Sequence, residues 1–136
     1  MNLEQVTNTS NAFAAFMHFF YNNTLIPVEI EYAVYGDGWA GTMDFKGYLN
    51  GKKTLLDWKT SKSIYLDSMG PQLAAYWVAD GRWAEQAGIL RLDKVKRIYE
   101  LKLLKPKRLE KYYREYTHMV NLYFERHPII AKKAGQ

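Results

Sequence analysis

Asp44, Asp57 and Lys59 combine the residue types that carry metal-assisted hydrolysis. Carboxylate oxygens are hard ligands, and a chain of 136 residues with no Cys and three His favours Mg²⁺ or Mn²⁺ over zinc. A lysine beside a metal held by carboxylates can orient or deprotonate the attacking water, or neutralise a phosphate oxygen. The alternative interpretation is an exposed hairpin with two unrelated acids and a solvated lysine. The elements that position the three residues distinguish these interpretations.

A β-hairpin is predicted to carry all three residues. The segments 39–49 and 52–59 have the character of extended strands, and Asn50-Gly51 joins them. Asn-Gly is the strongest short hairpin signal, because both central residues of a type I′ turn need a positive φ. A β-bulge at Gly47 is the alternative that would shift the pairing.

The register of this hairpin places the two aspartates opposite each other. With a two-residue turn, Leu49 pairs with Lys52. Counting outward from that pair places Asp44 directly across from Asp57 on the same face, with Cβ atoms ~4.5–5.5 Å apart. Facing carboxylates repel each other, so the pair needs a shared proton or a cation. Lys59 follows Asp57 by two residues and therefore projects on the same face.

The remaining elements follow from apolar periodicity and from chain breakers. In chain order they are a helix over 12–22 capped by Asn8 or Ser10, a strand over 28–35 after Pro27, the two hairpin strands, a helix over 66–80, a strand over 86–93, a strand within 95–104 and a helix over 106–126. The spacing in 95–104 also suits a helix, but its position before Pro106 favours a strand. The order predicts one α/β domain over 1–136, a mixed β-sheet flanked by helices, with a loose tail at 131–136.

Composition excludes several classes of protein. Hydrophobic residues make up 48% and charged residues 24% of the chain, which are the proportions of a globular domain rather than a disordered one. The absence of Cys excludes disulfide scaffolds, thiolate zinc sites and cysteine nucleophiles. No apolar run approaches the ~20 residues of a membrane span, and residues 1–11 lack the basic and apolar regions of a secretory signal. We therefore expect an intracellular protein.

The charge is unevenly distributed and indicates a polyanionic partner. Residues 1–90 carry a net charge of −3, and residues 91–136 carry +8. This basic block favours a nucleic acid over a membrane surface, with a solvated helix face as the alternative. The cations that could follow a phosphate backbone are Arg91, Lys94, Lys96, Arg97, Lys102, Lys105, Lys107, Arg108 and Lys111. Aromatic side chains among them could stack on single-stranded bases, or the tyrosines of 112–123 could be core residues.

Three short motifs resemble those of one nuclease superfamily. They are Gly41-Thr42-Met43-Asp44, then Asp57-Trp58-Lys59-Thr60-Ser61-Lys62, then Gln72-Leu73-Ala74-Ala75-Tyr76. In type and spacing they resemble the PD-(D/E)xK superfamily, in its RecB-like branch, which includes phage exonucleases and mitochondrial genome-maintenance exonucleases. The resemblance implies a restriction-endonuclease-like core. It also implies a divalent-metal-dependent, exonuclease-like DNA nuclease that hydrolyses phosphodiester bonds in single- or double-stranded DNA.

The resemblance also implies the roles of the central residues. Asp44 and Asp57 would bind the catalytic Mg²⁺ or Mn²⁺, joined by the backbone carbonyl of Trp58. Lys59 would assist the nucleophilic water.

Further roles fall on residues outside the hairpin motif. Glu29 would be the upstream acid of the first strand and a possible metal ligand, with Glu31 as the second choice. Gln72 and Tyr76 stand at i and i+4 on one helix face, which in the family lines the site and holds the nucleic acid backbone. Lys62, at the end of the second motif, would contact the substrate.

The chain departs from the family pattern in one respect. RecB-like enzymes commonly carry a metal-binding histidine on an upstream helix near a Gly-Thr pair, and the only upstream candidate here is His18, without that pair. Two other functions stay open: a non-catalytic nucleic-acid-binding module on the same fold, and a metal phosphoesterase that acts on nucleotides. A binding module has no need of the intact Asp44, Asp57 and Lys59. The small size fits a protein encoded by a virus or a mobile element.

Overall fold

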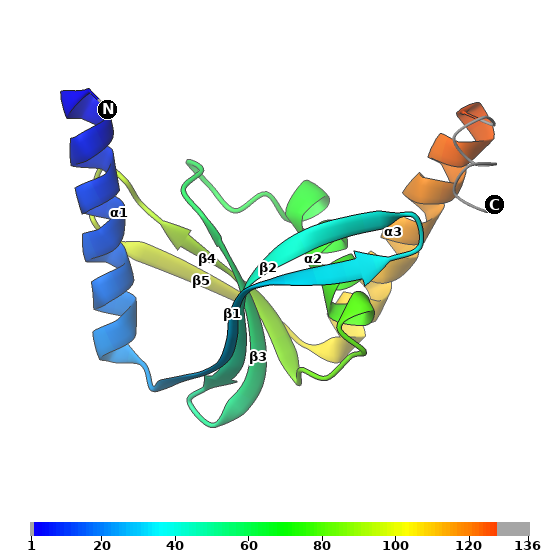
Figure 1. Ribbon diagram of the computed structural model, residues 1–136, viewed down its shortest axis with the longest axis horizontal. Helices are drawn as coiled ribbons and strands as arrows, with labels where there is room; N and C mark the ends of the chain where they lie inside the picture. Colours follow the sequence, from blue (N-terminus) through cyan, green and yellow to red (C-terminus); the bar gives the residue numbers. More distant parts are fainter. Residues whose placement is uncertain (1, 128–136) are drawn as a thin grey trace.

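The chain folds into an α/β structure, which the computed structural model describes for residues 2–127. Its elements in chain order are α1 (Leu3–Asn22), β1 (Leu25–Gly36), β2 (Trp39–Leu49), β3 (Lys52–Lys59), α2 (Leu66–Ala79), β4 (Gln86–Leu92), β5 (Tyr99–Leu104) and α3 (Pro106–Arg126) (Figure 1). The predicted element order is confirmed. The tail predicted at 131–136 lies outside the described residues. No helix within 2–127 is both long and apolar enough to cross a membrane.

The strands of residues 2–127 form one sheet in the order β1-β2-β3-β4-β5. Neighbouring strands are antiparallel except β3 and β4. These two run parallel because α2 carries the chain back along the sheet between them, as parallel strands require. The predicted mixed sheet is therefore confirmed.

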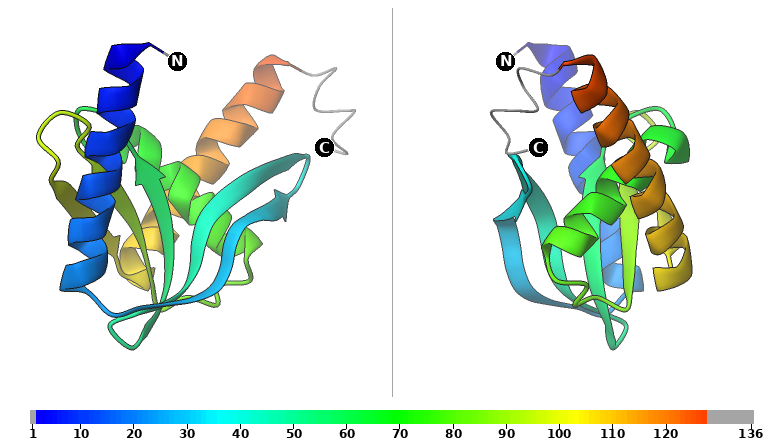
Figure 2. Two further views of the ribbon diagram at one scale, coloured as in Figure 1. Left: turned by 60° about the vertical axis from the view of Figure 1, so that its left-hand side comes forward. Right: turned by 90° about the vertical axis from the view of Figure 1, so that its right-hand side faces the viewer.

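Helices cover both faces of this sheet (Figure 2). On one face α1 packs Ala15 and Phe19 into a buried cluster. On the other face α2 and α3 bury Leu73, Trp77 and Leu109. The central strands consequently have an apolar cluster on each side.

The alternation of side chains along β3 determines on which face of the sheet Asp57 lies. Leu55 packs in the cluster under α2 and α3, whereas Leu56 packs in the cluster under α1. Continuing this alternation places Asp57 on the α2 side and Trp58 on the α1 side. The Trp58 ring indeed lies against Phe16 of α1, with ring centroids 5.8 Å apart.

The hairpin of β1 and β2 bends out of the sheet and leans over α2 and α3 (Figures 1 and 2). The pairing of β1 shifts by one residue between Pro27 and Glu29, and Glu31 has a φ of 49°. In β2, Met43 packs under α2 and α3 while Phe45 packs under α1. A regular strand would point these two side chains to the same face, so the strand is distorted between them.

Helix α1 begins at Leu3, so the prediction of a helix from residue 12 capped by Asn8 or Ser10 was wrong. The cap is Asn2, whose side chain accepts from the N–H of Gln5, while the Gln5 side chain accepts from the N–H of Asn2, both at 2.9 Å. This reciprocal pair satisfies two N–H groups that the helix itself leaves free. Two threonines in the following turns donate to carbonyls four residues earlier, which makes them compatible with a helix.

Other boundaries differ by a few residues. Strand β1 starts at Leu25, before Pro27, which is tolerated because β1 is an edge strand. The strand favoured within 95–104 is confirmed from Tyr99 onward, after a turn at 94–96. The bounds predicted for β2, β3 and α3 are those observed.

Candidate active site

The hairpin of β2 and β3 adopts the predicted register. Asn50 and Gly51 form its turn with φ values of 52° and 85°, as a type I′ turn requires. Pairing is regular from this turn out to Phe45 and Leu56, so the β-bulge considered at Gly47 is absent from this pair of strands. The two aspartates occupy the next position outward.

At Asp44 the backbone pairing of β2 with β3 stops, and a side-chain hydrogen bond takes its place. The Asp44 Oδ2 atom accepts a hydrogen bond of 2.8 Å from the backbone N–H of Trp58. The Asp57 carboxyl lies next to that of Asp44, close enough for its side chain and its charge to raise the pKa of Asp44. Lys59 completes the cluster, with its Nζ atom 3.0 Å from Asp57 Oδ2. The hairpin thus brings together the three residues that the sequence predicted.

Asp44 holds its proton much more readily than an ordinary aspartate does. Burial raises the pKa of Asp44 to about 7, and the hydrogen bond and the charge of Asp57 act in the same direction. The N–H of Trp58 and the charge of Lys59 act in the opposite direction without cancelling the shift. Two neighbouring carboxylates favour a proton or a cation between them, so a divalent cation can take the place of the proton on Asp44.

The aspartate pair suits Mg²⁺ or Mn²⁺. Mg²⁺ usually keeps several waters and is held by one or two carboxylates, and Asp44 and Asp57 supply two. Among residues 2–127, no group of three or more His, Cys, Asp or Glu side chains is placed to hold a metal ion. The carbonyl of Trp58 as a further ligand stays a prediction.

The structure does not bring the predicted upstream acids into this cluster. Glu29 is exposed and in register with Lys46, away from the position of the aspartate pair along the strand. The charge of Glu29 instead acts on Tyr32, and it is the smallest of the causes that raise the pKa of the Tyr32 hydroxyl. Glu31 is exposed and has a left-handed backbone at the bend of β1.

A second buried polar cluster, which the sequence did not predict, lies beside Glu29. Lys46 Nζ forms an ion pair of 3.1 Å with Asp80 at the end of α2 and lies 4.8 Å from the centre of the Trp83 ring. Burial, and after it the charge of Asp80, raise the pKa of the Tyr32 hydroxyl well above its usual range. The cluster fastens the β1–β2 hairpin to α2. Because Lys46 and Asp80 are 34 positions apart, no local pattern could have indicated it.

His18 does not join the aspartates either. It is exposed on α1, which packs on the face of the sheet opposite Asp57 and Lys59. Trp58 is one of the residues that link α1 to the hairpin, through its contact with Phe16, beside the buried Phe45 and Leu56.

The third motif contacts the first. Gln72 Nε2 lies 3.2 Å from Tyr76 Oη, so the two predicted substrate-binding residues of α2 are joined on one helix face. Tyr76 in turn lies against Gly41 of β2, where an added Cβ would be 2.5 Å from the tyrosine oxygen. Gly41 precedes Asp44 by three residues, so α2 is held directly against the strand that carries the site.

The loop after β3 is tied down by an arginine that sequence analysis assigned to the nucleic acid backbone. Lys62, the predicted substrate contact, is exposed in this loop. The Arg91 guanidinium donates to the Ser61 carbonyl at 3.4 Å, to Asp93 at 3.3 Å and to Glu100 at 3.0 Å. Arg91 is therefore engaged within the chain, and it positions the loop that presents Lys62.

Among the predicted cations, Lys102 lies in the same row of the sheet as the aspartates. Asp57, Ile89 and Lys102 are in register across β3, β4 and β5, which puts their side chains on the same face. Lys102 is exposed. By contrast, the Arg108 guanidinium lies over the Tyr112 ring at 5.6 Å and donates to its hydroxyl.

Two neighbouring acids, a lysine beside them and an exposed lysine in the same row can bind a divalent cation and a phosphate. No protein-family model and no curated protein matches this sequence. The assignment of the site therefore depends on the geometry of these residues.

Proposed function

We propose that the chain is a divalent-metal-dependent DNA nuclease that hydrolyses phosphodiester bonds in an exonuclease-like manner with Mg²⁺ or Mn²⁺. One observation carries the proposal: the β2–β3 hairpin sets Asp57 next to Asp44, whose pKa is raised to about 7, and Lys59 Nζ lies 3.0 Å from Asp57 Oδ2. Neither a buried acid pair nor an adjacent lysine is needed to close a hairpin whose turn and register are already satisfied.

The arrangement of the motifs supports a nuclease of the PD-(D/E)xK superfamily. The element order α-β-β-β-α-β-β-α is compatible with a restriction-endonuclease-like core and with the RecB-like branch. Gly41, at the start of the first motif, packs against Tyr76, at the end of the third. Motifs that are far apart in the sequence are thus in contact at one site.

Each residue of the cluster has a definite task in this proposal. Asp44 and Asp57 hold the cation, and the N–H of Trp58 fixes the orientation of Asp44. A bound divalent cation supplies Lewis-acid chemistry, since it lowers the pKa of a coordinated water and offsets charge on an attacked phosphate. The Lys59 side chain is 31% exposed, so its ammonium can reach the nucleophile or a phosphate oxygen. Lys102 and Lys62 neutralise the neighbouring backbone.

Cleavage by a charge-neutral variant tests the proposal. Labelled single- and double-stranded DNA is incubated with Mg²⁺ or Mn²⁺ and with wild type, Asp57→Asn, or Asp67→Asn as the matched control, since Asp67 is exposed on α2. We expect cleavage by wild type and by Asp67→Asn, and none by Asp57→Asn. If wild type cleaves neither DNA with either metal, the nuclease proposal is wrong.

One observation favours a second candidate, a non-catalytic nucleic-acid-binding module on the same fold. Glu29 lies beside the Lys46 cluster rather than with the aspartate pair, so residues 2–127 contain no group of three acids around one point. Such a module would bind DNA without cleaving it, and its DNA affinity would be unchanged by Asp57→Asn in the presence of Mn²⁺.

A further inference from the structure

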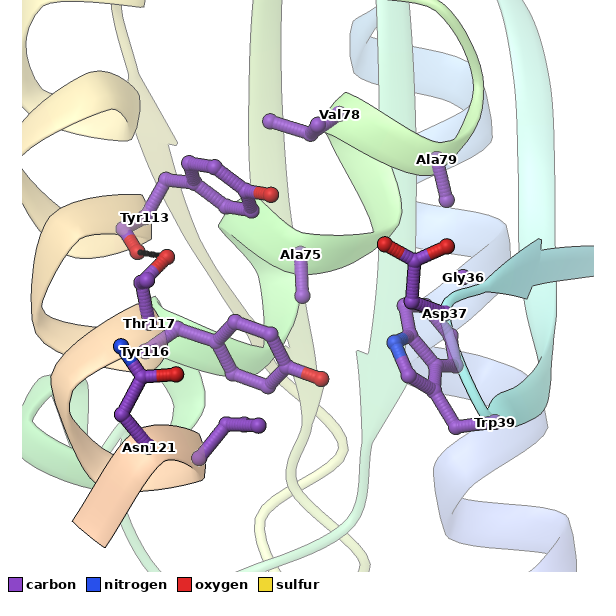
Figure 3. A pocket seen from close by; sticks show the side chains of 11 residues that line it. Gly36, Asp37, Trp39, Ala75, Val78, Ala79, Tyr113, Tyr116, Thr117 and Asn121 are labelled. Atoms are coloured by element: carbon purple, nitrogen blue, oxygen red, sulfur yellow. Dashed lines mark hydrogen bonds between the residues drawn. The ribbon is translucent and has the colours of Figure 1, made fainter. Parts of the chain in front are cut away.

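A cleft outside the aspartate site separates the tip of the β1–β2 hairpin from α3 (Figure 3). It encloses about 300 Å³. Trp39 and Asp37 of the hairpin form one wall, and Tyr113 and Tyr116 of α3 form the other, with Ala75 of α2 between them. The other lining residues are Gly36, Val78, Ala79, Thr117, Val120 and Asn121.

The walls of this cleft are aromatic. Trp39 is stacked on Tyr76 with ring centroids 5.5 Å apart, and Tyr113 is stacked on Tyr116 at 6.1 Å. Tyr116 meets Trp39 edge-on at 6.4 Å. Aromatic faces around a cavity of this size suit a flat ring, since a base stacked on an aromatic side chain gains about 1–3 kcal/mol whatever its sequence.

The polar groups of the cleft favour one kind of base over others. None of its described lining residues is Lys or Arg, so the cleft offers no cation to a phosphate. It offers instead the carboxylate of Asp37 on the hairpin wall, and an amide from Asn121 on the α3 wall. A carboxylate accepts hydrogen bonds from an exocyclic amino group, as it does from cytosine N4. Thymine has no such group.

The cleft is continuous with the third motif. Trp39 and Tyr76 also line a smaller adjoining hollow together with Gln72. Trp39 precedes Asp44 by five residues on β2, about 17 Å along an extended strand. A DNA strand at the aspartates could therefore extend along Gln72 and Tyr76 to the cleft.

We propose that the cleft takes one unstacked nucleobase bearing an amino group, from a single-stranded stretch of DNA that passes the aspartate pair. The path of the DNA strand past the aspartates rests on the nuclease proposal, whereas the binding of a base in the cleft does not. A base held in a duplex cannot enter, so the cleft makes single-stranded DNA the tighter ligand.

Binding without metal tests this inference separately from cleavage. Anisotropy is measured for labelled single-stranded dodecamers of dC and of dT and for a dodecamer duplex, with metal removed by chelation. The variants are Tyr116→Ala and Asp37→Asn. The controls are Tyr35→Ala, a tyrosine of the same hairpin that is 72% exposed, and Asp67→Asn. A dC dodecamer with one 2-aminopurine reports stacking through quenching of its fluorescence.

We expect wild type to bind oligo(dC) more tightly than oligo(dT) or the duplex. Tyr116→Ala should weaken binding of both single strands about 5- to 150-fold and remove the quenching. Asp37 is exposed in the turn between β1 and β2, so we expect Asp37→Asn to fold as wild type does. This variant should lose the preference for dC over dT. The two controls should bind as wild type does.

Two results would overturn the inference: equal affinity of wild type for oligo(dC) and oligo(dT), or wild-type affinity and quenching in both cleft variants. Those results leave the nuclease proposal standing if metal-dependent cleavage is observed. Conversely, cleft-dependent binding by a protein that cleaves nothing supports the cleft and removes the nuclease proposal.

Discussion

Tyr76 Oη occupies the space that a side chain at position 41 would need, because a Cβ built on Gly41 lies 2.5 Å from this oxygen. The neighbouring ring atoms of Tyr76 are within 2.9 Å of the same point. Gly41 is therefore a packing requirement of the contact between β2 and α2, rather than a turn or hinge. This contact holds α2 against the strand that carries Asp44.

We first predict that Gly41→Ala destabilises the protein by about 1–3 kcal/mol, the usual cost of overpacking. In a Tyr76→Ala background the same substitution should cost much less, because the clashing ring is gone. Denaturant unfolding of the four proteins measures this coupling. Additive effects of the two substitutions would contradict the contact.

The second prediction concerns pH and metal-free stability. The pKa of Asp44 is raised to about 7 in the folded protein, against an unfolded value near 4. Between these values the native state binds a proton that the unfolded chain has lost. The stabilisation from this group is complete below about pH 4 and is lost as the pH rises through 7.

Wild type should therefore lose about 1–3 kcal/mol of stability relative to Asp44→Asn between pH 5 and pH 8, and the upper figure is the full linkage for a pKa that moves from near 4 to about 7. The asparagine retains an oxygen that can accept from the Trp58 N–H, so the variant keeps that hydrogen bond. Urea unfolding of both proteins with a chelator present gives the difference. A difference in stability that does not change with pH would show that the pKa of Asp44 is not raised in the folded protein.

The third prediction concerns the metal. Because the cation must displace the proton on Asp44, the affinity for Mn²⁺ should rise up to tenfold per pH unit below about pH 7 and level off above it. Titration calorimetry in two buffers of different ionisation enthalpy should show about one proton released at pH 6. Asp57→Asn should bind Mn²⁺ far more weakly, and Asp67→Asn should match wild type. Affinity that is the same at pH 6 and pH 8 would argue against this site.

The fourth prediction separates chemistry from metal binding. Lys59→Ala should lower cleavage by orders of magnitude, because its ammonium acts where charge develops, while the affinity for Mn²⁺ changes little, since ammonium is not a ligand. Lys52→Ala, an exposed lysine at the other end of β3, is the matched control. Normal turnover by Lys59→Ala would remove this lysine from the mechanism.

The fifth prediction concerns the basic residues. Lys102→Ala, in the row of Asp57 and Ile89, should weaken DNA binding and reduce the salt slope by about one. The combined variant of Lys105, Lys107 and Arg108 to Ala, at the start of α3, should also flatten the slope while cleavage at saturating DNA largely persists. Binding measured against salt for both variants tests this. An unchanged slope in the triple variant would show that the start of α3 is a solvated face.

The hairpin could be predicted from sequence because its information is local. The Asn50-Gly51 turn fixes the register as far as Phe45 and Leu56, and counting one position further predicts that Asp44 and Asp57 are neighbours. The spacing of apolar residues, every second position in strands and every three to four in helices, likewise predicted most helix and strand bounds to within a few residues.

The surroundings of the site could not be predicted in this way. The pairing of β1 shifts before Glu29 and the backbone at Glu31 is left-handed, so β1 does not keep the regular alternation that the sequence pattern predicts. The ion pair of Lys46 with Asp80 and the approach of Trp39 to Tyr116 join segments with no shared pattern. Tertiary contacts of this kind leave no periodic signal.

The distortions of β1 also have a consequence for association between molecules. An edge strand with free N–H and C=O groups can add a strand from another chain, and this leads to aggregation. In β1, Pro27 lacks an N–H, the pairing shifts before Glu29, and the left-handed backbone at Glu31 interrupts the row again. The exposed Ile26, Val28 and Ile30 thus lie on an edge that offers no long, flat template. Replacing Pro27 with Val and removing the shift would produce such a template, at the strand with the most exposed apolar side chains.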